Sequence, residues 1–198
     1  MPNDFGFDFR ATQAYVTDPS YATYEIGTGV NYPTTRTVNG VSLTFGWETV
    51  QLSFPGTRDR NSALDPRIAG ISFNANNLLT VTYRVDLPAT GVWSIGMSTG
   101  DGAGPNAQNN HIVINDTNTQ VLDCSVNTTA TQVGDAAKNV WTTAQWPGSN
   151  VMVNTTFSTT ILRVVLGGTN DSNNSCIGHL RLTQIASPRR QLALMGVG

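Results

Sequence analysis

The sequence carries little charge and a single lysine. Charged residues make up 12% of its 198 residues, and the basic residues are ten arginines and Lys138. The formal net charge is -2, and the sequence contains no basic run. Because the negatively charged backbone of nucleic acid is bound by clustered Lys and Arg, we expect no nucleic-acid partner.

Long apolar runs are missing as well. No segment approaches the roughly 18 consecutive apolar residues that cross a bilayer as a helix, so we expect no membrane insertion. The first residues, Met1 to Phe5, contain neither the charged region nor the apolar region of a secretory signal peptide. We therefore expect a protein that is made in the cytoplasm and carries no export signal.

Cysteine is scarce. The only two cysteines, Cys124 and Cys176, have no CxxC or Cys/His spacing around them, which argues against zinc. A chain of this length buries roughly 70% of its unfolded surface, so its core needs neither a metal nor a disulfide. A bridge between the two remains open at this point, and two half-buried free thiols are the favoured interpretation.

The dominant pattern is alternation of apolar and polar residues with period two. In Thr80 to Leu87, four apolar side chains fall on one face and four polar side chains on the other, which is typical of a strand with one packed face. Polar surface comes mainly from 27 Thr and 19 Asn, which suit strands and turns. The expected strands are 5–9, 41–47, 68–73, 78–87, 91–98, 111–115, 119–124, 140–146, 151–157, 160–166 and 177–185. This pattern predicts two packed antiparallel sheets in one domain, residues 1–186, with 131–140 as the one place for a short helix.

Three long connections, 12–39, 54–66 and 99–106, are the expected carriers of function. Within the second connection, Arg58, Asp59 and Arg60 either form a local ion-pair network with nearby Asp65 and Arg67 or offer directional hydrogen bonds to sugar hydroxyls or a partner protein. Both interpretations are open.

The third connection is rich in glycine, and we expect it to expose Asp101. Three tryptophans, Trp47, Trp141 and Trp146, are either core or interface residues or stack on sugar rings. The expected carbohydrate-binding residues are Trp47, Arg58, Asp59, Arg60, Asp101, Trp141 and Trp146.

Metal and catalytic signals are weak. Asp101, Asp171 and the Asn-rich run 170–174 could give oxygen ligands to calcium but lack EF-hand spacing, so we expect no cofactor and leave structural calcium as the one alternative. Gly96 to Gly100 matches the spacing of a nucleophile elbow around Ser98, and a triad with Asp101 and either His111 or His179 is conceivable. The glycine-rich residues that follow cannot begin the helix this motif requires, so we expect no catalysis by Ser98.

Several segments together resemble the galactose-binding-like β-sandwich found in many carbohydrate-binding modules. The segments that carry the resemblance are 7–9, 84–88, 91–95, 100–101, 111–116 and 178–185. The resemblance spans roughly residues 5 to 186 and implies a two-sheet antiparallel jelly-roll β-sandwich. It is a likeness of fold and does not identify a ligand.

A standalone sandwich without a signal peptide that ends in Arg189 to Gly196 resembles virion proteins of tailed phages and gene transfer agents more than a secreted hydrolase. This likeness implies a non-enzymatic virion protein that decorates the particle or binds host cell-surface polysaccharide, assembled with other virion proteins or with copies of itself. The alternatives are a carbohydrate esterase or lyase domain, and a purely structural capsid or tail subunit. We expect the tail, residues 187–198, to dock on another subunit through Arg189, Arg190, Leu192, Leu194 and Met195.

Overall fold

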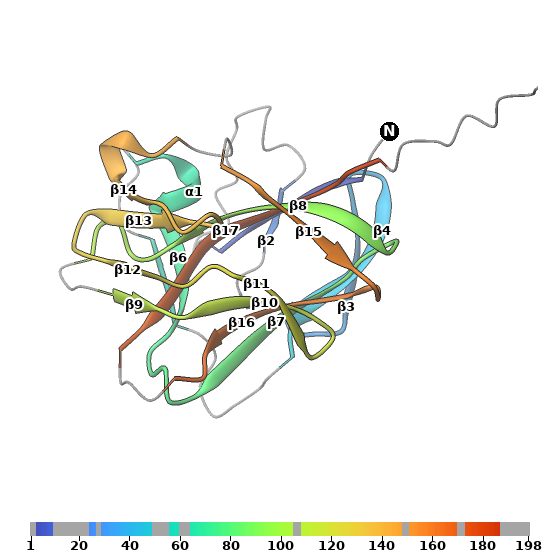
Figure 1. Cartoon of the computed structure of the whole chain (residues 1–198), viewed down its shortest axis with the longest axis horizontal. Helices are drawn as coiled ribbons and strands as arrows, with labels where there is room; N and C mark the ends of the chain where they lie inside the picture. The colour runs from blue at the N-terminus through green and yellow to red at the C-terminus, as the bar shows by residue number, and fades with distance from the viewer. Residues whose placement is uncertain are drawn as a thin grey trace, which may run out of the picture.

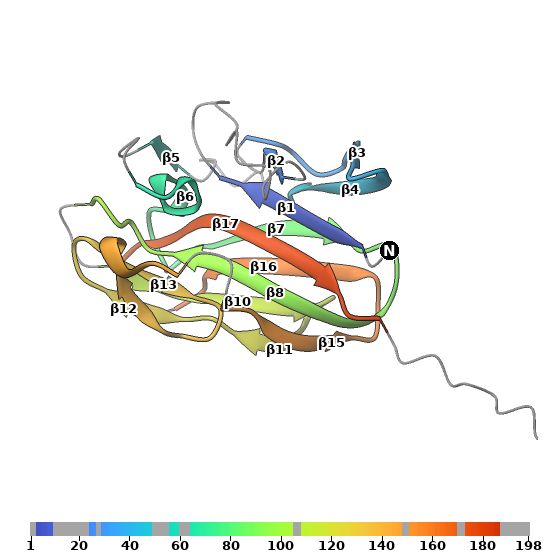
Figure 2. The ribbon, with the colours of Figure 1, turned by 90° about the horizontal axis from the view of Figure 1, so that it is seen from above.

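The computed structural model describes residues 3–9, 24–26, 29–48, 56–59, 64–104, 108–147, 151–169 and 173–186. Two large β-sheets pack face to face, as Figures 1 and 2 show from two directions. The prediction of an all-β, two-sheet antiparallel sandwich is therefore confirmed. The jelly-roll strand order stays a prediction.

The first sheet has six antiparallel strands. Their order is β11 (Thr119–Asp123), β10 (Ile112–Asp116), β16 (Ile161–Gly167), β7 (Thr80–Asp86), β4 (Val41–Trp47) and β3 (Thr34–Val38). Strand β7 shows the expected alternation, because Val81, Tyr83 and Val85 are buried while Arg84 and Asp86 lie on the outer face. Burial of one face is what fixes the register of such a strand.

The second sheet is larger and mixed. It contains β1 (Asp4–Asp8), β2 (Tyr24–Ile26), β5 (Gly56–Asp59), β6 (Gly70–Asn74), β8 (Gly91–Thr99), β13 (Gln132–Asp135), β14 (Val140–Thr142), β15 (Val153–Phe157) and β17 (Ser175–Gln184). Strand β17 lies between β8 and β1, and only β1 and β2 run parallel among these described pairs. A separate pair, β9 (Gln108–Asn110) and β12 (Val126–Thr128), closes one end of the sandwich.

Aromatic rings fill the space between the sheets. Phe7 of β1 packs against Phe45 and Tyr83 of the six-stranded sheet, with ring centroids 5.0 and 5.6 Å apart. Trp93 on β8 is fully buried, which confirms its predicted place in the core. Contacts of this kind join the two layers into one hydrophobic core.

Several segments differ from the sequence-based expectation. The expected strand 68–73 begins only at Gly70, because Asp65 accepts a hydrogen bond from the backbone N–H of Arg67 and caps a one-turn helix, α1 (Pro66–Ala69). The expected strand 140–146 ends at Thr142 and continues as a 3-10 turn, η2 (Thr143–Gln145). The segment 131–140 contains strand β13 and the first residue of β14 in place of a helix.

The described helices are too short to cross a membrane. Cys124 and Cys176 are unbridged, which confirms the prediction of free thiols, but both are fully buried and not half-buried as expected. Burial raises the pKa of the Cys124 thiol to about 12, so this thiol stays protonated and unreactive.

Candidate functional site

A polar groove lies at the end of the sandwich closed by β9 and β12. It has a volume of about 340 Å³, at the small end of the range for ligand pockets. In the β9–β12 pair, Gln108 lies opposite Thr128 and Asn109 opposite Asn127. We call this feature the amide groove; its lining residues are Gln108, Asn109, Asn127, Thr128, Thr129 and Asn173.

Buried amides hold the floor of the amide groove in place. The Asn110 side chain accepts a hydrogen bond from the backbone N–H of Cys176 at 2.9 Å and donates one to Thr128 Oγ1 at 3.2 Å. Asn77 donates from its side chain to the carbonyl of Asn109 at 2.7 Å and from its backbone to the carbonyl of Asn173 at 2.9 Å. These bonds join β9, β12 and β17, so the groove is formed before any ligand arrives.

The lining offers both donors and acceptors to a ligand. Gln108 Oε1 accepts from the Cys176 thiol at 3.4 Å, so its amide nitrogen remains as a donor. Thr129 Oγ1 donates to Gln132 Oε1 at 2.6 Å, so its lone pairs remain as acceptors. Asn127 is exposed, and its side chain has no hydrogen-bond partner in the part of the chain that the structure describes. Mixed donors and acceptors of this kind suit hydroxyl groups, which act as both.

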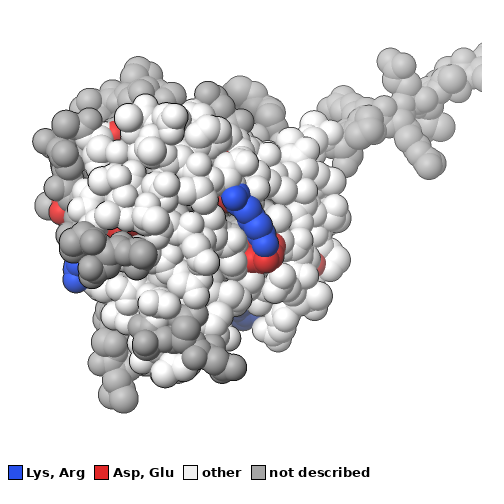
Figure 3. Space-filling model, turned by 60° about the vertical axis from the view of Figure 1, so that its left-hand side comes forward, with Lys and Arg blue, Asp and Glu red and all other residues white. Residues whose placement is uncertain are grey.

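Among the residues that the structure describes, no charged side chain lines the amide groove. In the described parts of 99–147, the one Lys or Arg is Lys138, and it pairs with Asp123. The other carboxylates there, Asp101, Asp116 and Asp135, are buried. Figure 3 shows the side of the molecule where β9, β12, β13 and β14 are labelled in Figure 1, and nearly all its described atoms belong to uncharged residues.

The glycine-rich connection borders this groove, but the exposed position expected for Asp101 was wrong. Asp101 is only 3% exposed, and its carboxylate accepts from the backbone N–H of Ala103 at 3.4 Å. Gly100 has a φ of +90°, and a Cβ there would lie 2.8 Å from Thr128 Oγ1. The loop therefore turns Asp101 inward while glycine lets the backbone approach the groove floor.

Trp47 is a core residue, contrary to its assignment to a carbohydrate surface. It is fully buried, with its ring 5.7 Å from that of Phe9 and 5.0 Å from that of Tyr83. Both contacts lie between the sheets, so no ring face is open to a sugar. Period two along β4, where Leu43 and Phe45 share its face, is the signal that would have placed it correctly.

The other two tryptophans are half-buried and lie outside the groove lining. Trp141 donates its indole N–H to Asp135 at 2.7 Å and so fastens the β13–β14 hairpin. Trp146 meets the His179 ring edge-on at 6.2 Å, and its buried indole nitrogen has no hydrogen-bond partner among the described residues. The structure thus gives Trp141 a structural contact and places Trp146 against the nine-stranded sheet.

The basic connection is fastened locally. Asp65 and Arg67 form an ion pair at 2.5 Å, which confirms one part of the predicted ion-pair network. On β5, Arg58 places its guanidinium 4.7 Å from the ring centre of Phe73, and Asp59 is half-buried. Neither residue lines the amide groove. The remaining predicted residues lie outside the described residues: Arg60, Arg189, Arg190, Leu192, Leu194 and Met195.

The structure brings Ser98 and His179 together. Ser98 Oγ lies 3.1 Å from His179 Nδ1, which is within hydrogen-bond reach. Both residues are 1% exposed, however, and the Ser98 hydroxyl donates its proton to the carbonyl of Arg67 at 2.5 Å. His179 Nδ1 is then the donor to Ser98 and not a base for it. His111 is elsewhere, with Nδ1 2.7 Å from the carbonyl of Gly167.

His179 is held neutral. Burial, reinforced by the positive charge of Arg67, lowers the pKa of its imidazole to about 3. Among the described residues, no three His, Cys, Asp or Glu side chains gather as a metal site. Asp171, one of the expected calcium ligands, lies outside the described residues.

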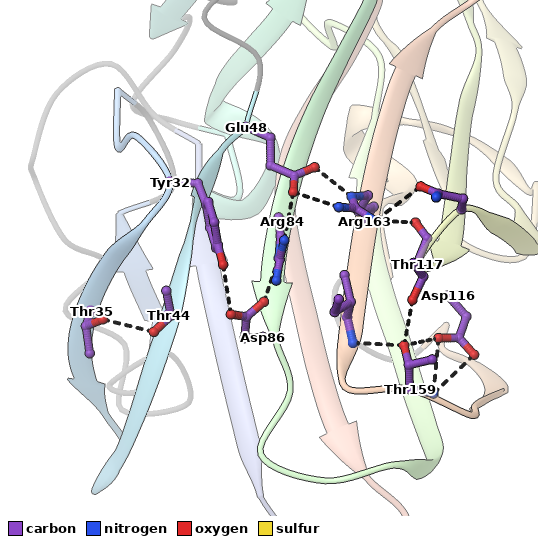
Figure 4. A network of polar contacts seen from close by, with 12 residues as sticks. Tyr32, Thr35, Thr44, Glu48, Arg84, Asp86, Asp116, Thr117, Thr159 and Arg163 are labelled. Carbon is purple, nitrogen blue, oxygen red and sulfur yellow. Dashed lines mark hydrogen bonds and ion pairs between the residues drawn. The ribbon is translucent and has the colours of Figure 1, made fainter.

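A second polar region covers the outer face of the six-stranded sheet, and the sequence did not reveal it. Figure 4 shows its members, which we call the sheet-face cluster: Tyr32, Glu48, Arg84, Asp86 and Arg163. Glu48 is bound by Arg163 at 2.6 and 2.9 Å and by Arg84 at 3.1 Å. Arg84 also binds Asp86 at 2.6 Å and lies 4.4 Å from the centre of the Tyr32 ring.

The charges of the sheet-face cluster neutralise one another. Partial burial alone would raise the pKa of Glu48, but the hydrogen bonds from Arg163 and Arg84 outweigh it and lower that pKa. Arg163 additionally donates to the carbonyl of Thr117 at 2.7 Å. Each charged group in the cluster therefore has an opposite charge as its partner, which marks the cluster as structural.

Comparison with known proteins identifies no relative: no family model matches the chain, and no curated protein matches its sequence.

Proposed function

We propose that this chain is a non-enzymatic carbohydrate-binding β-sandwich and that it binds glycan in the amide groove. The observation that carries the proposal is the groove itself, whose lining is uncharged and consists of Asn, Gln and Thr side chains over a floor of buried, hydrogen-bonded amides. A small number of convergent polar groups is the usual means of orienting a small ligand.

We further propose that the domain works as a phage-type virion protein that attaches to host cell-surface polysaccharide or decorates the particle. This step is supported by the resemblance of residues 5–186 to galactose-binding-like sandwiches and by the likeness of such a sandwich with the tail Arg189 to Gly196 to virion proteins. A module of this kind binds its ligand and catalyses no reaction on it. Partners would be surface glycans and other virion subunits.

The test is binding of the purified chain to a glycan array that includes bacterial surface polysaccharides. We expect saturable binding that falls about tenfold or more when Asn127→Ala and Gln108→Ala are combined, since each removes a groove amide. Lys138→Ala, on the same side of the molecule but outside the lining, is the matched control and should bind normally. An unchanged glycan affinity in the double variant would show that the glycan binds outside the amide groove.

The second candidate is a carbohydrate esterase, and the 3.1 Å contact between Ser98 and His179 favours it. Both residues are buried, and the Ser98 hydroxyl donates its proton to the backbone carbonyl of Arg67. These two features favour the binding module over the esterase. Release of acetate from acetylated polysaccharide by the native chain, lost in Ser98→Ala, would establish the esterase. A purely structural subunit would bind no glycan but would still be incorporated into the virion.

A further inference from the structure

We infer that the amide groove selects an electrically neutral, hydroxyl-bearing sugar and discriminates against acidic sugars such as uronic acids. This inference rests on the proposed function and specifies its ligand. It follows from two independent features of the described residues, namely the direction of the hydrogen bonds in the lining and the absence of a free cation near it.

The direction of the hydrogen bonds disfavours an anion. The Thr129 hydroxyl donates its hydrogen bond to Gln132 Oε1, and the backbone N–H of Thr129 donates to the same oxygen at 2.9 Å. The lone pairs of Thr129 Oγ1 therefore remain as acceptors at the groove. A sugar hydroxyl can donate to that oxygen, whereas a carboxylate, which only accepts, would face it with like partial charge.

The remaining lining groups also fit a hydroxyl. The Thr128 hydroxyl is buried and accepts from Asn110, so it holds the groove floor and leaves ligand contacts to the other lining groups. Gln108 offers a donor from its amide nitrogen, and the Asn127 amide offers both a donor and an acceptor. A ring with several hydroxyls can satisfy these groups together, since every hydroxyl both donates and accepts.

The charge distribution disfavours an anion as well. Burying a carboxylate without a cationic partner is costly. In the described parts of 99–147, the only Lys or Arg is Lys138, which Asp123 already neutralises. The two arginines of the sheet-face cluster are bound by Glu48. An acidic sugar in the groove would thus lose water and gain no opposite charge.

The test compares neutral glucose oligosaccharides and neutral N-acetylglucosamine oligosaccharides with glucuronic-acid-containing oligosaccharides of equal length, by titration calorimetry. We expect at least one neutral probe to bind about tenfold or more tightly than its acidic counterpart. Raising the salt concentration from about 0.05 M to about 0.5 M should change the dissociation constant of the neutral probe by less than about twofold, because salt screens only interactions between charges.

Asn127 permits a matched pair of substitutions at an exposed position. Asn127→Lys places a cation at the groove and should narrow or reverse the preference against the acidic probe, with salt-dependent binding. Asn127→Asp should weaken the acidic probe further and affect the neutral probe less. Unfolding curves for both variants should overlay that of the native chain.

Tighter, salt-sensitive binding of the acidic probe to the native chain would overturn this inference and leave glycan binding intact. Failure of every neutral and acidic glycan to bind would overturn the proposed function, and this inference with it. The two failures are therefore distinguishable in one experiment.

Discussion

The sheet-face cluster and the amide groove are both polar surfaces of one sandwich, yet they differ in how their polar groups are satisfied. In the cluster, Glu48 binds both Arg84 and Arg163, and the three side chains are 17–20% exposed. In the groove, the lining side chains are uncharged, and Asn127 is left without a partner in the described part of the chain. Charges that are paired internally stabilise the fold, whereas neutral amides that face solvent can exchange water for a ligand.

Acid should have the largest effect on stability, and it should act first through His179, a buried residue outside both regions. The unfolded chain protonates His179 near its ordinary pKa of 6.5, but the folded chain does so only near 3, so acid favours unfolding between these values. The slope reaches about 1.4 kcal/mol per pH unit. Asn in place of His179, with an amide nitrogen near the position of Nδ1, should flatten this slope in urea titrations. An unchanged slope in that variant would contradict the assignment to His179.

Carboxylates extend the same trend at lower pH. Burial would raise the pKa of Asp123, but hydrogen bonds from Lys138 and Ser125 lower it to about 2, and the pKa of Glu48 is lowered too. Their contribution to stability is complete above the ordinary carboxyl pKa of about 4 and is lost as the pH falls through the folded value. The described lining residues of the groove carry no titratable side chain, so glycan affinity should stay constant wherever the chain remains folded.

The largest effect of a single substitution is expected in the sheet-face cluster. Glu48→Ala leaves Arg84 and Arg163, which lie opposite each other on β7 and β16, without their shared carboxylate. We expect a loss of about 2–3 kcal/mol in the free energy of unfolding, measured by urea denaturation. Glu48→Gln, which keeps the shape, should lose less. A loss below about 0.5 kcal/mol in Glu48→Ala would show that the cluster is only surface charge.

A smaller effect is expected where two hairpins meet. Asp116 accepts hydrogen bonds from the backbone N–H groups of Ser158 and Thr159 and from both hydroxyls. Burial would raise the pKa of Asp116, but these bonds lower it. Asp116→Asn, which converts two acceptor oxygens to one, should lower the free energy of unfolding by about 1–2 kcal/mol. A stabilised variant would contradict this account of the carboxylate.

The smallest effect on stability is expected in the amide groove. Asn127→Ala removes an exposed side chain with no partner among the described residues, so the free energy of unfolding should change by less than about 0.5 kcal/mol. Glycan affinity should nevertheless fall by about tenfold. A stability loss as large as that of Glu48→Ala would erase the contrast between the two regions.

The sequence predicted the layers of this fold better than its sites. Period two located β7, β8, β16 and β17 because one face of each packs in the core. Strands β9 and β12 are three residues long and carry mainly Asn, Gln and Thr, so they show no apolar period. Trp47 and Asp101 were misplaced because the sequence alone does not say whether a strand end or a glycine-rich loop turns a side chain inward.

The amide groove was missed for a related reason. Its lining comes from three segments, 108–109, 127–129 and 173, which the β9–β12 pairing and the hydrogen bonds of Asn77 bring together. Such long-range pairing is invisible in local spacing. The density of Asn and Thr near residues 106–110 and 127–131 was the one available signal.

Side-chain NMR tests the central claim most directly. Titrating the ¹⁵N-labelled chain with a neutral oligosaccharide that binds on the array should shift the side-chain amide signals of Gln108 and Asn127. The Nε–H signals of Arg84 and Arg163, which are held by Asp86 and Glu48, should stay in place. Shifts confined to the two arginine signals, with the groove amides unmoved, would contradict the account.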